Sequence, residues 1–296
     1  METRRPMFFL LPIGVDYHTD RYPVVTFSLI GINVVAYLAG FLALIVGGED
    51  AVIWMFQHLW LIPAESSAQA YVTTLFVHAG LLHLIGNMIY LFLFGACVED
   101  MIGRGKFIAF YLLGGLAADL AHIILTPGNF SSDLPLGGAS GAVSACIGGF
   151  VLFFHKTRIN FRYFVWFLRI WTGEFLLPAW LVITFWFAKD FLSAAFDYVS
   201  AGSGSGVAYA AHVGGFVSGF AMIAGYKAWR RWNEAEEEKA LLAGKFPATA
   251  GFRTAEVASM YLFDAGVQLG PFTNAQVTEM IALGSLSTDL KIKRVF

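Results

Sequence analysis

Long runs of apolar residues, separated by short polar segments, dominate the first 232 residues of the chain. A helix needs about 20 mostly apolar residues to cross the roughly 30 Å hydrocarbon core of a membrane. Six runs meet or approach this length: Val24–Val46, Leu81–Met101, Phe107–Leu125, Gly138–His155, Phe175–Phe196 and Val207–Trp229. The fourth run is short and rich in small residues, which favours burial among other helices. The pattern predicts an all-α membrane protein built as a six-helix bundle.

Lysine and arginine residues orient this bundle. The segments 47–80, 126–137 and 197–206 contain neither residue, whereas basic residues occur in the alternate segments and at both ends of the bundle. Because cytoplasmic loops carry an excess of Lys and Arg, both termini are predicted to be cytoplasmic. Lys189 and Asp190 lie inside the fifth run, where adjacent opposite charges are expected to pair or to reach toward the interface.

The composition agrees with a membrane protein. Hydrophobic residues make up 57% of the 296 residues and charged residues 14%, against roughly 25% charged in soluble domains. The net charge of −2 argues against a nucleic-acid partner. Two cysteines, Cys97 and Cys146, cannot form a disulfide framework, and both fall in apolar runs, so they are interpreted as small core residues.

The chain beyond the last apolar run differs in character. Residues 1–22 are expected to form a cytoplasmic N-terminal segment, 23–232 the six-helix domain, 233–256 a charged helix and linker, and 257–296 a small cytoplasmic α+β module. Within that module, 268–271 (QLGP) is predicted to be a turn, and Asn274 is predicted to cap a helix over Ala275–Leu283.

Four polar residues share one predicted depth in the membrane. His83 and Asn87 lie near the outer start of the second run, Ser140 near that of the fourth and His212 near that of the sixth. These positions correspond to a depth of very roughly 5–10 Å at 1.5 Å per residue. Ionisable or strongly polar residues inside a membrane are costly, so their convergence indicates a functional site.

A serine beside a histidine is a nucleophile–base pair. We predict Ser140 as the nucleophile and His212 as the general base and then acid, with His83, Asn87 and a backbone N–H near Ser140 as donors to the oxyanion. No acid in the spans is obviously placed to orient His212, because Asp119 is expected in the middle of the third span. The sequence therefore predicts a dyad.

Simpler interpretations remain open for each residue alone. A Gly/Ala/Ser-rich helix start is usually a packing feature, and Asn87 alone would more often hold helices together. His78 and His122 are first interpreted as hydrogen-bonded structural residues. His78 and His83 have no acidic partner and no HExxH motif accompanies them, so no metal site is predicted. The shared depth is what favours a catalytic site.

These residues resemble the rhomboid family of intramembrane serine proteases over roughly Tyr22–Trp232. The matching motifs are FVHAGLLHLIGNM at 76–88, GACVE at 95–99, GASGA at 138–142 and AHVGGFVSG at 211–219. The resemblance implies a Ser140–His212 dyad, an oxyanion site formed by His83, Asn87 and the Ser140 N–H, and no cofactor. Supporting roles are implied for His78, Tyr209, Gly138 and Gly215. Two positions depart from better-known members: Leu61 follows Trp60 where many have Arg, and Ser144 replaces a Tyr of some members.

The resemblance also implies what the chain acts on and where it is located. The family cleaves single-span membrane proteins near the outer end of their helix, so the expected partners are transmembrane substrates and the lipid bilayer, in a bacterial inner membrane. Residues 257–296 are similar to GYF-like domains, which implies a cytoplasmic peptide or protein partner. One alternative is a catalytically silent, chaperone-like binder of the same fold. A second is a small-solute transporter, which is less consistent with the sequence because transporters often contain repeated halves and none is seen here.

Overall fold

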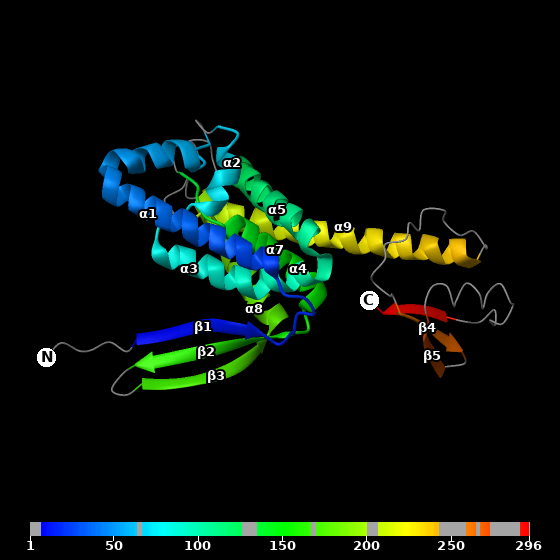
Figure 1. Ribbon diagram of the computed structural model, residues 1–296. Coiled ribbons are helices and arrows are strands. Elements are labelled where there is room, and N and C mark those ends of the chain that lie inside the picture. The colour runs from blue at the N-terminus through cyan, green and yellow to red at the C-terminus, as the bar shows by residue number, and fades with distance from the viewer. Residues whose placement is uncertain are drawn as a thin grey trace. The chain divides into compact units, whose positions relative to one another are not determined.

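A computed structural model describes residues 7–63, 67–125, 135–166, 170–199, 207–242, 259–264, 267–272 and 291–295. The chain divides into two compact units, Met1–Arg231 and Trp232–Phe296. Helices make up most of the first unit, as the apolar pattern predicts (Figure 1).

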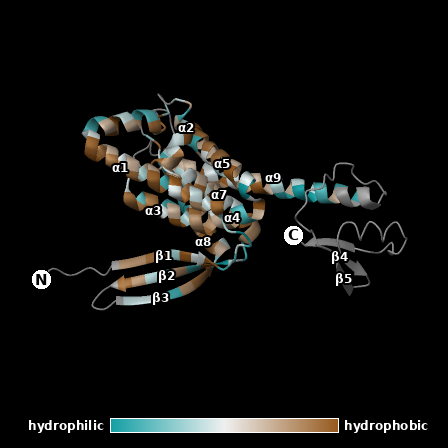
Figure 2. Ribbon diagram, viewed as in Figure 1, coloured by the Kyte–Doolittle hydropathy of each residue, from teal (hydrophilic) through white to brown (hydrophobic). Residues whose placement is uncertain are grey.

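The helices of the described chain are, in order, α1 (Val24–Leu59), α2 (Ala70–Thr73), α3 (Leu81–Tyr90), α4 (Ala96–Ile102), α5 (Arg104–Leu125), α7 (Ser140–Phe154), α8 (Ala179–Val199) and α9 (Tyr209–Leu242). A 3₁₀ turn, η1 (Thr74–Phe76), follows α2, and a π-helical turn, η2 (Leu91–Gly95), joins α3 to α4. Apolar residues colour most of the bundle in Figure 2, whereas the later part of α9 is hydrophilic.

Four helical segments of the described chain are long and apolar enough to cross a membrane: Val24–Leu59, Leu81–Ile102, Arg104–Leu125 and Ala179–Val199. Helix α7 is apolar but shorter. These segments agree with four of the six predicted spans, and the six-span count stays a prediction. Helix α1 is longer than predicted because it continues into the segment expected to be an outer loop, with a kink at Gly48, whose φ of +60° suits a glycine.

A three-stranded antiparallel sheet in the first unit was not predicted, and the all-α expectation is wrong for these segments. Strands β1 (Met7–Val15), β2 (Arg158–Trp166) and β3 (Ile170–Pro178) pair in the order β1-β2-β3 (Figure 1). All three are rich in the aromatic and branched residues that favour strands. Phe175, predicted to begin the fifth span, lies in β3, and α8 begins at Ala179.

Two carboxylates at the end of α4 hold the segment that leads into α1. Glu99 is 3% exposed and accepts hydrogen bonds from the N–H groups of Val25 and Thr26 and from the Thr26 hydroxyl, at 3.0, 2.7 and 2.7 Å. Asp100 accepts the Tyr17 hydroxyl at 2.6 Å. Since the first N–H groups of a helix lack intrahelical partners, Glu99 caps α1 from a neighbouring helix.

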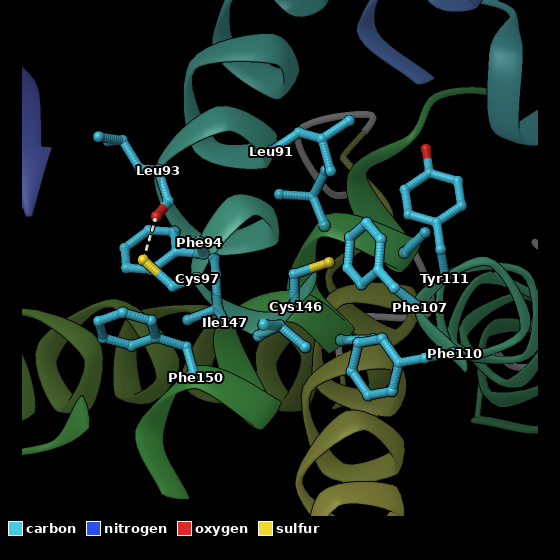
Figure 3. Close-up of a cluster of buried hydrophobic side chains, with 14 of the residues drawn as sticks. Leu91, Leu93, Phe94, Cys97, Phe107, Phe110, Tyr111, Cys146, Ile147 and Phe150 are labelled. Atoms are coloured by element: carbon cyan, nitrogen blue, oxygen red, sulfur yellow. Dashed lines mark hydrogen bonds between the residues drawn. The ribbon is translucent and has the colours of Figure 1, made fainter. Parts of the chain in front are cut away.

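The apolar core lies where α4, α5 and α7 meet the π-helical turn. Figure 3 shows Phe94, Phe107 and Phe150 packed around both cysteines. Cys97 donates its thiol to the carbonyl of Leu93 at 3.2 Å, and both cysteines are free and buried (Figure 3). The interpretation of the cysteines as core residues is confirmed.

The second unit contains three described strands, β4 (Ser259–Asp264), β5 (Val267–Phe272) and β6 (Lys291–Val295), which pair antiparallel in the order β5-β4-β6. The turn predicted at 268–271 is wrong because these residues lie within β5. The predicted helix Ala275–Leu283 lies outside the described residues. The module boundaries and the GYF-like resemblance stay predictions.

Candidate active site

Ser140 is the first residue of α7, and a tight turn with an unusual backbone precedes it. Gly138 has φ +131°, a conformation that side chains rarely allow. Its N–H donates to the carbonyl of Thr74 at 2.9 Å, and the next N–H, of Ala139, donates to Nε2 of His78 at 3.5 Å. Two N–H groups of this turn therefore fix the start of α7, one by donating to a backbone carbonyl of η1 and the other by donating to the His78 side chain.

His78 lies just before the membrane-spanning segment that begins at Leu81, and it is 8% exposed. Burial lowers its pKa to about 4, and the neighbouring His83 ring acts in the same direction. The imidazole is consequently neutral at physiological pH, which leaves Nε2 free to accept the N–H of Ala139. This hydrogen bond agrees with the structural interpretation of His78, and a supporting role in catalysis stays a prediction.

His83 and Asn87 on α3 face the turn that leads to Ser140. A Cβ added to Gly138 would lie 2.7 Å from Cε1 of His83 and 3.6 Å from Nδ2 of Asn87. Asn87 is 7% exposed, and its Nδ2 has no hydrogen-bond partner among the described residues. An unpaired buried donor is unusual in folded proteins and calls for an explanation. Here the donor lies beside the turn that leads to the serine.

His212 lies in the first turn of α9, and glycines bring that helix against α7. A Cβ on Gly215 would lie 3.1 Å from the carbonyl carbon of Gly141 and 3.2 Å from Cβ of Ser144. A Cβ on Gly219 would lie 2.6 Å from the carbonyl carbon of Ala145. Gly215 and Gly219 are four residues apart on one face of α9, and the absence of side chains at both positions permits this close approach.

Among the described residues, Asp190, Trp186 and Tyr209 surround the imidazole of His212. Its Nδ1 is 2.9 Å from Oδ2 of Asp190 on α8. The Trp186 ring stacks on it with centroids 6.0 Å apart, and the Tyr209 ring meets it edge-on at 6.2 Å. The expectation that no acid in the spans is placed beside His212 is wrong, because Asp190 lies within hydrogen-bond distance of its imidazole. The predicted Lys189–Asp190 pair is confirmed, with Nζ 2.6 Å from Oδ1.

The structure brings α7 and α9 together, but the described residues show no hydrogen bond between the Ser140 hydroxyl and His212. Nucleophile–base hydrogen bonds often tighten only when substrate binds. Asp119 is 4% exposed on α5 and makes no described hydrogen bond to His212. Within the described part of the chain, no group of three or more His, Cys, Asp or Glu residues could hold a metal ion.

Comparison with known proteins defines the class. A model of the rhomboid domain matches residues 65–229, which is more than half of the chain. The chain belongs to the rhomboid family.

The individual relatives are distant. The chain is 35% identical over 77 residues to "Rhomboid protease GluP" of Bacillus subtilis, which covers 26% of this chain and 14% of that protein. It is 31% identical over 160 residues to "Rhomboid-related protein 2" of Mus musculus, covering 53% and 48%. It is 25% identical over 140 residues to "Rhomboid protease GlpG" of Haemophilus influenzae, covering 47% and 66%. The chain thus spans less than half the length of the first two relatives.

Proposed function

We propose that the protein is an intramembrane serine endopeptidase that cleaves single-span membrane proteins near the outer end of their transmembrane helix. The observation that carries the proposal is the unpaired, buried Nδ2 of Asn87 beside Gly138, at the turn that leads to Ser140. A buried donor without a partner is suited to an oxyanion that exists only during the reaction. The rhomboid membership supports the same chemistry.

The proposed reaction uses a Ser140–His212 pair. Oγ of Ser140 attacks the carbonyl carbon of the substrate peptide while its proton moves to Nε2 of His212. The oxyanion accepts hydrogen bonds from Asn87, His83 and the Ser140 N–H. When the C–N bond breaks, the imidazolium gives its proton to the leaving amine. Water then attacks the acyl-enzyme, its proton passes through Nε2 to Oγ, and the free carboxylic acid and serine are restored.

The remaining expectations about location and partners belong to the same proposal. We infer six spans with both termini cytoplasmic in a bacterial inner membrane, because Lys and Arg avoid alternate connecting segments. In this topology, residues 257–296 are cytoplasmic and available to bind a peptide or protein partner. Tyr209 and Gly215 have supporting roles, since one contacts the His212 ring and the other allows α9 to approach α7.

The test is cleavage of single-span helical peptides, with small residues near the outer end, co-reconstituted with the full chain in liposomes. Ser140→Ala and His212→Ala should lower cleavage below detection. Asn87→Ala should lower it by about 10²–10³-fold, the usual cost of one oxyanion donor. Ser218→Ala is the matched control, because the hydrogen bond described for its hydroxyl goes to a carbonyl of its own helix, that of Gly215 at 2.9 Å.

Wild-type cleavage that persists undiminished in Ser140→Ala would overturn the proposed nucleophile. A folded wild-type chain that binds the peptides but cleaves none would instead support a catalytically silent, chaperone-like member of the family. Equal loss in Ser218→Ala would indicate that the assay reports on folding rather than on chemistry.

A further inference from the structure

Asp190 on helix α8 is a buried acid that the Ser140–His212 pair does not include. Its side chain is 1% exposed, and Oδ2 lies 2.9 Å from Nδ1 of His212. Trp186, one helical turn earlier, stacks on the imidazole with the ring planes at 24°. Helix α8 therefore holds the imidazole at its Nδ1 edge and on one face.

The surroundings of Asp190 favour its ionised form by direct pairing. Lys189 forms an ion pair, with Nζ 2.6 Å from Oδ1, an oxygen that has no hydrogen-bond partner among the described residues, while Oδ2 is within hydrogen-bond distance of His212. The Lys189 side chain is 51% exposed, and its ammonium also lies 4.9 Å from the centre of the Tyr209 ring. A buried carboxylate is tolerated when it is paired and hydrogen-bonded, and Asp190 meets both conditions.

We infer that Asp190 is a positioning residue that completes a Ser–His–Asp arrangement; this rests on the proposed function. By accepting Nδ1–H of His212, the carboxylate leaves Nε2 unprotonated and able to take the proton of Ser140. It also stabilises the imidazolium that forms when that proton arrives. Asp190 itself stays ionised, and the proton moves only among Oγ, Nε2 and the leaving amine.

Lys189 makes the consequence of an Asp190→Asn substitution specific. An ammonium can only donate, so the new amide would turn its oxygen toward Lys189 and its NH₂ group toward His212. The imidazole would then accept at Nδ1 and carry its proton on Nε2, which is the wrong tautomer for a base. This is the explanation accepted for the large kcat loss of acid-to-amide variants in soluble serine proteases.

The first experiment measures kcat and KM of the full chain in liposomes with the peptides named above. D190N should lower kcat by about 10³–10⁴-fold while KM changes little. In the double variant K189M/D190N, no ammonium holds the new amide oxygen, so the amide can turn this oxygen toward His212. Its kcat should therefore be at least about ten-fold higher than that of D190N. D119N is the matched control, because it makes the same Asp-to-Asn change at a residue that is also buried, at 4% exposed, and for which the structure describes no hydrogen bond to His212.

The second experiment reads the tautomer without relying on cleavage. Ring ¹⁵N spectra of histidine-labelled full chain, with the His212 signal assigned by its loss in His212→Gln, should show the proton on Nδ1 in the wild type and on Nε2 in D190N. A wild-type proton on Nε2, or a D190N variant with unchanged kcat, would overturn the role of Asp190. Cleavage that survives in Ser140→Ala would instead refute the proposed function. The ¹⁵N spectra would still show separately whether Asp190 fixes the tautomer of His212.

Discussion

Substituting alanine for Gly219 tests how closely α9 must approach α7. The added Cβ would lie 2.6 Å from both the carbonyl carbon and Cα of Ala145, and its carbonyl oxygen is nearer still. Ordinary van der Waals contact begins at about 3.4 Å, so the two carbon contacts alone require the helices to separate by about 0.8 Å, and the carbonyl oxygen of Ala145 requires more. These neighbours are backbone atoms, which cannot turn away as a side chain could.

Gly225→Ala is the matched control, since it makes the same change on the same helix where nothing lies within 4 Å of the new Cβ. Alanine improves helix propensity by up to about 1 kcal/mol at either site. The difference between the two variants therefore isolates the contact, which should destabilise Gly219→Ala by about 1–3 kcal/mol relative to Gly225→Ala. A shift of nearly 1 Å at His212 should also lower kcat by up to about 10²-fold.

Unfolding in detergent micelles, followed by tryptophan fluorescence, measures the free energy of unfolding of both variants. Liposome cleavage assays measure kcat for the same preparations. Equal stability and equal kcat in Gly219→Ala and Gly225→Ala would refute the argument that the glycines of α9 permit the approach to α7.

Three further predictions test other parts of the structure. Glu99→Gln should lower the free energy of unfolding by about 2 kcal/mol, because the amide offers one acceptor oxygen where the carboxylate has two. Unfolding in detergent micelles measures this free energy, and an unchanged value would contradict the capping of α1 by Glu99. Gly138→Ala should lower kcat at least about ten-fold, because alanine is strained at the positive φ of this position and its Cβ would lie 2.7 Å from the His83 ring. A Gly138→Ala variant with the kcat of the wild type would contradict this prediction. The Arg162 guanidinium lowers the pKa of Glu174, so the stabilisation from this pair is present above the ordinary value of 4.5 and weakens as the pH falls below it. Thermal unfolding of Glu174→Gln should therefore show a small loss of stability at pH 7 that shrinks as the pH is lowered below 4.5, and a loss that does not depend on pH would contradict this.

The apolar runs predicted the helices well because membrane helices are local structures. Each one satisfies its own backbone hydrogen bonds, so an apolar run such as Phe107–Leu125 is sufficient to predict a helix, which the structure shows as α5 (Arg104–Leu125). The β1-β2-β3 sheet was missed for the opposite reason. Its first strand pairs with residues about 150 positions away, for example Leu11 with Arg162, and local patterns carry no information about such pairing. Arg162 within β2 also favoured an interpretation of that stretch as a connecting segment, since basic residues were used to assign the cytoplasmic side.

The candidate site shows the same division between local and distant information. Ser140, His83 and Asn87 stand out because polar residues are rare in apolar runs, and their closeness follows from a common depth. The partner of His212 could not be found that way. Asp190 stands beside Lys189, which offers a complete local explanation for its charge. Only the rotation of α8 about its axis decides that the second carboxylate oxygen reaches the imidazole, and sequence spacing does not report that rotation.

Labelling by a fluorophosphonate tests the central claim most directly, because this probe forms a covalent bond with an activated serine and needs no knowledge of the substrate. The full chain in liposomes should acquire one adduct, which mass spectrometry should locate on Ser140. Ser140→Ala should remain unlabelled, His212→Ala should label far more slowly, and Ser218→Ala should label like the wild type. A folded wild-type chain without an adduct on Ser140, or equal labelling of Ser140→Ala, would contradict the assignment of Ser140 as the nucleophile.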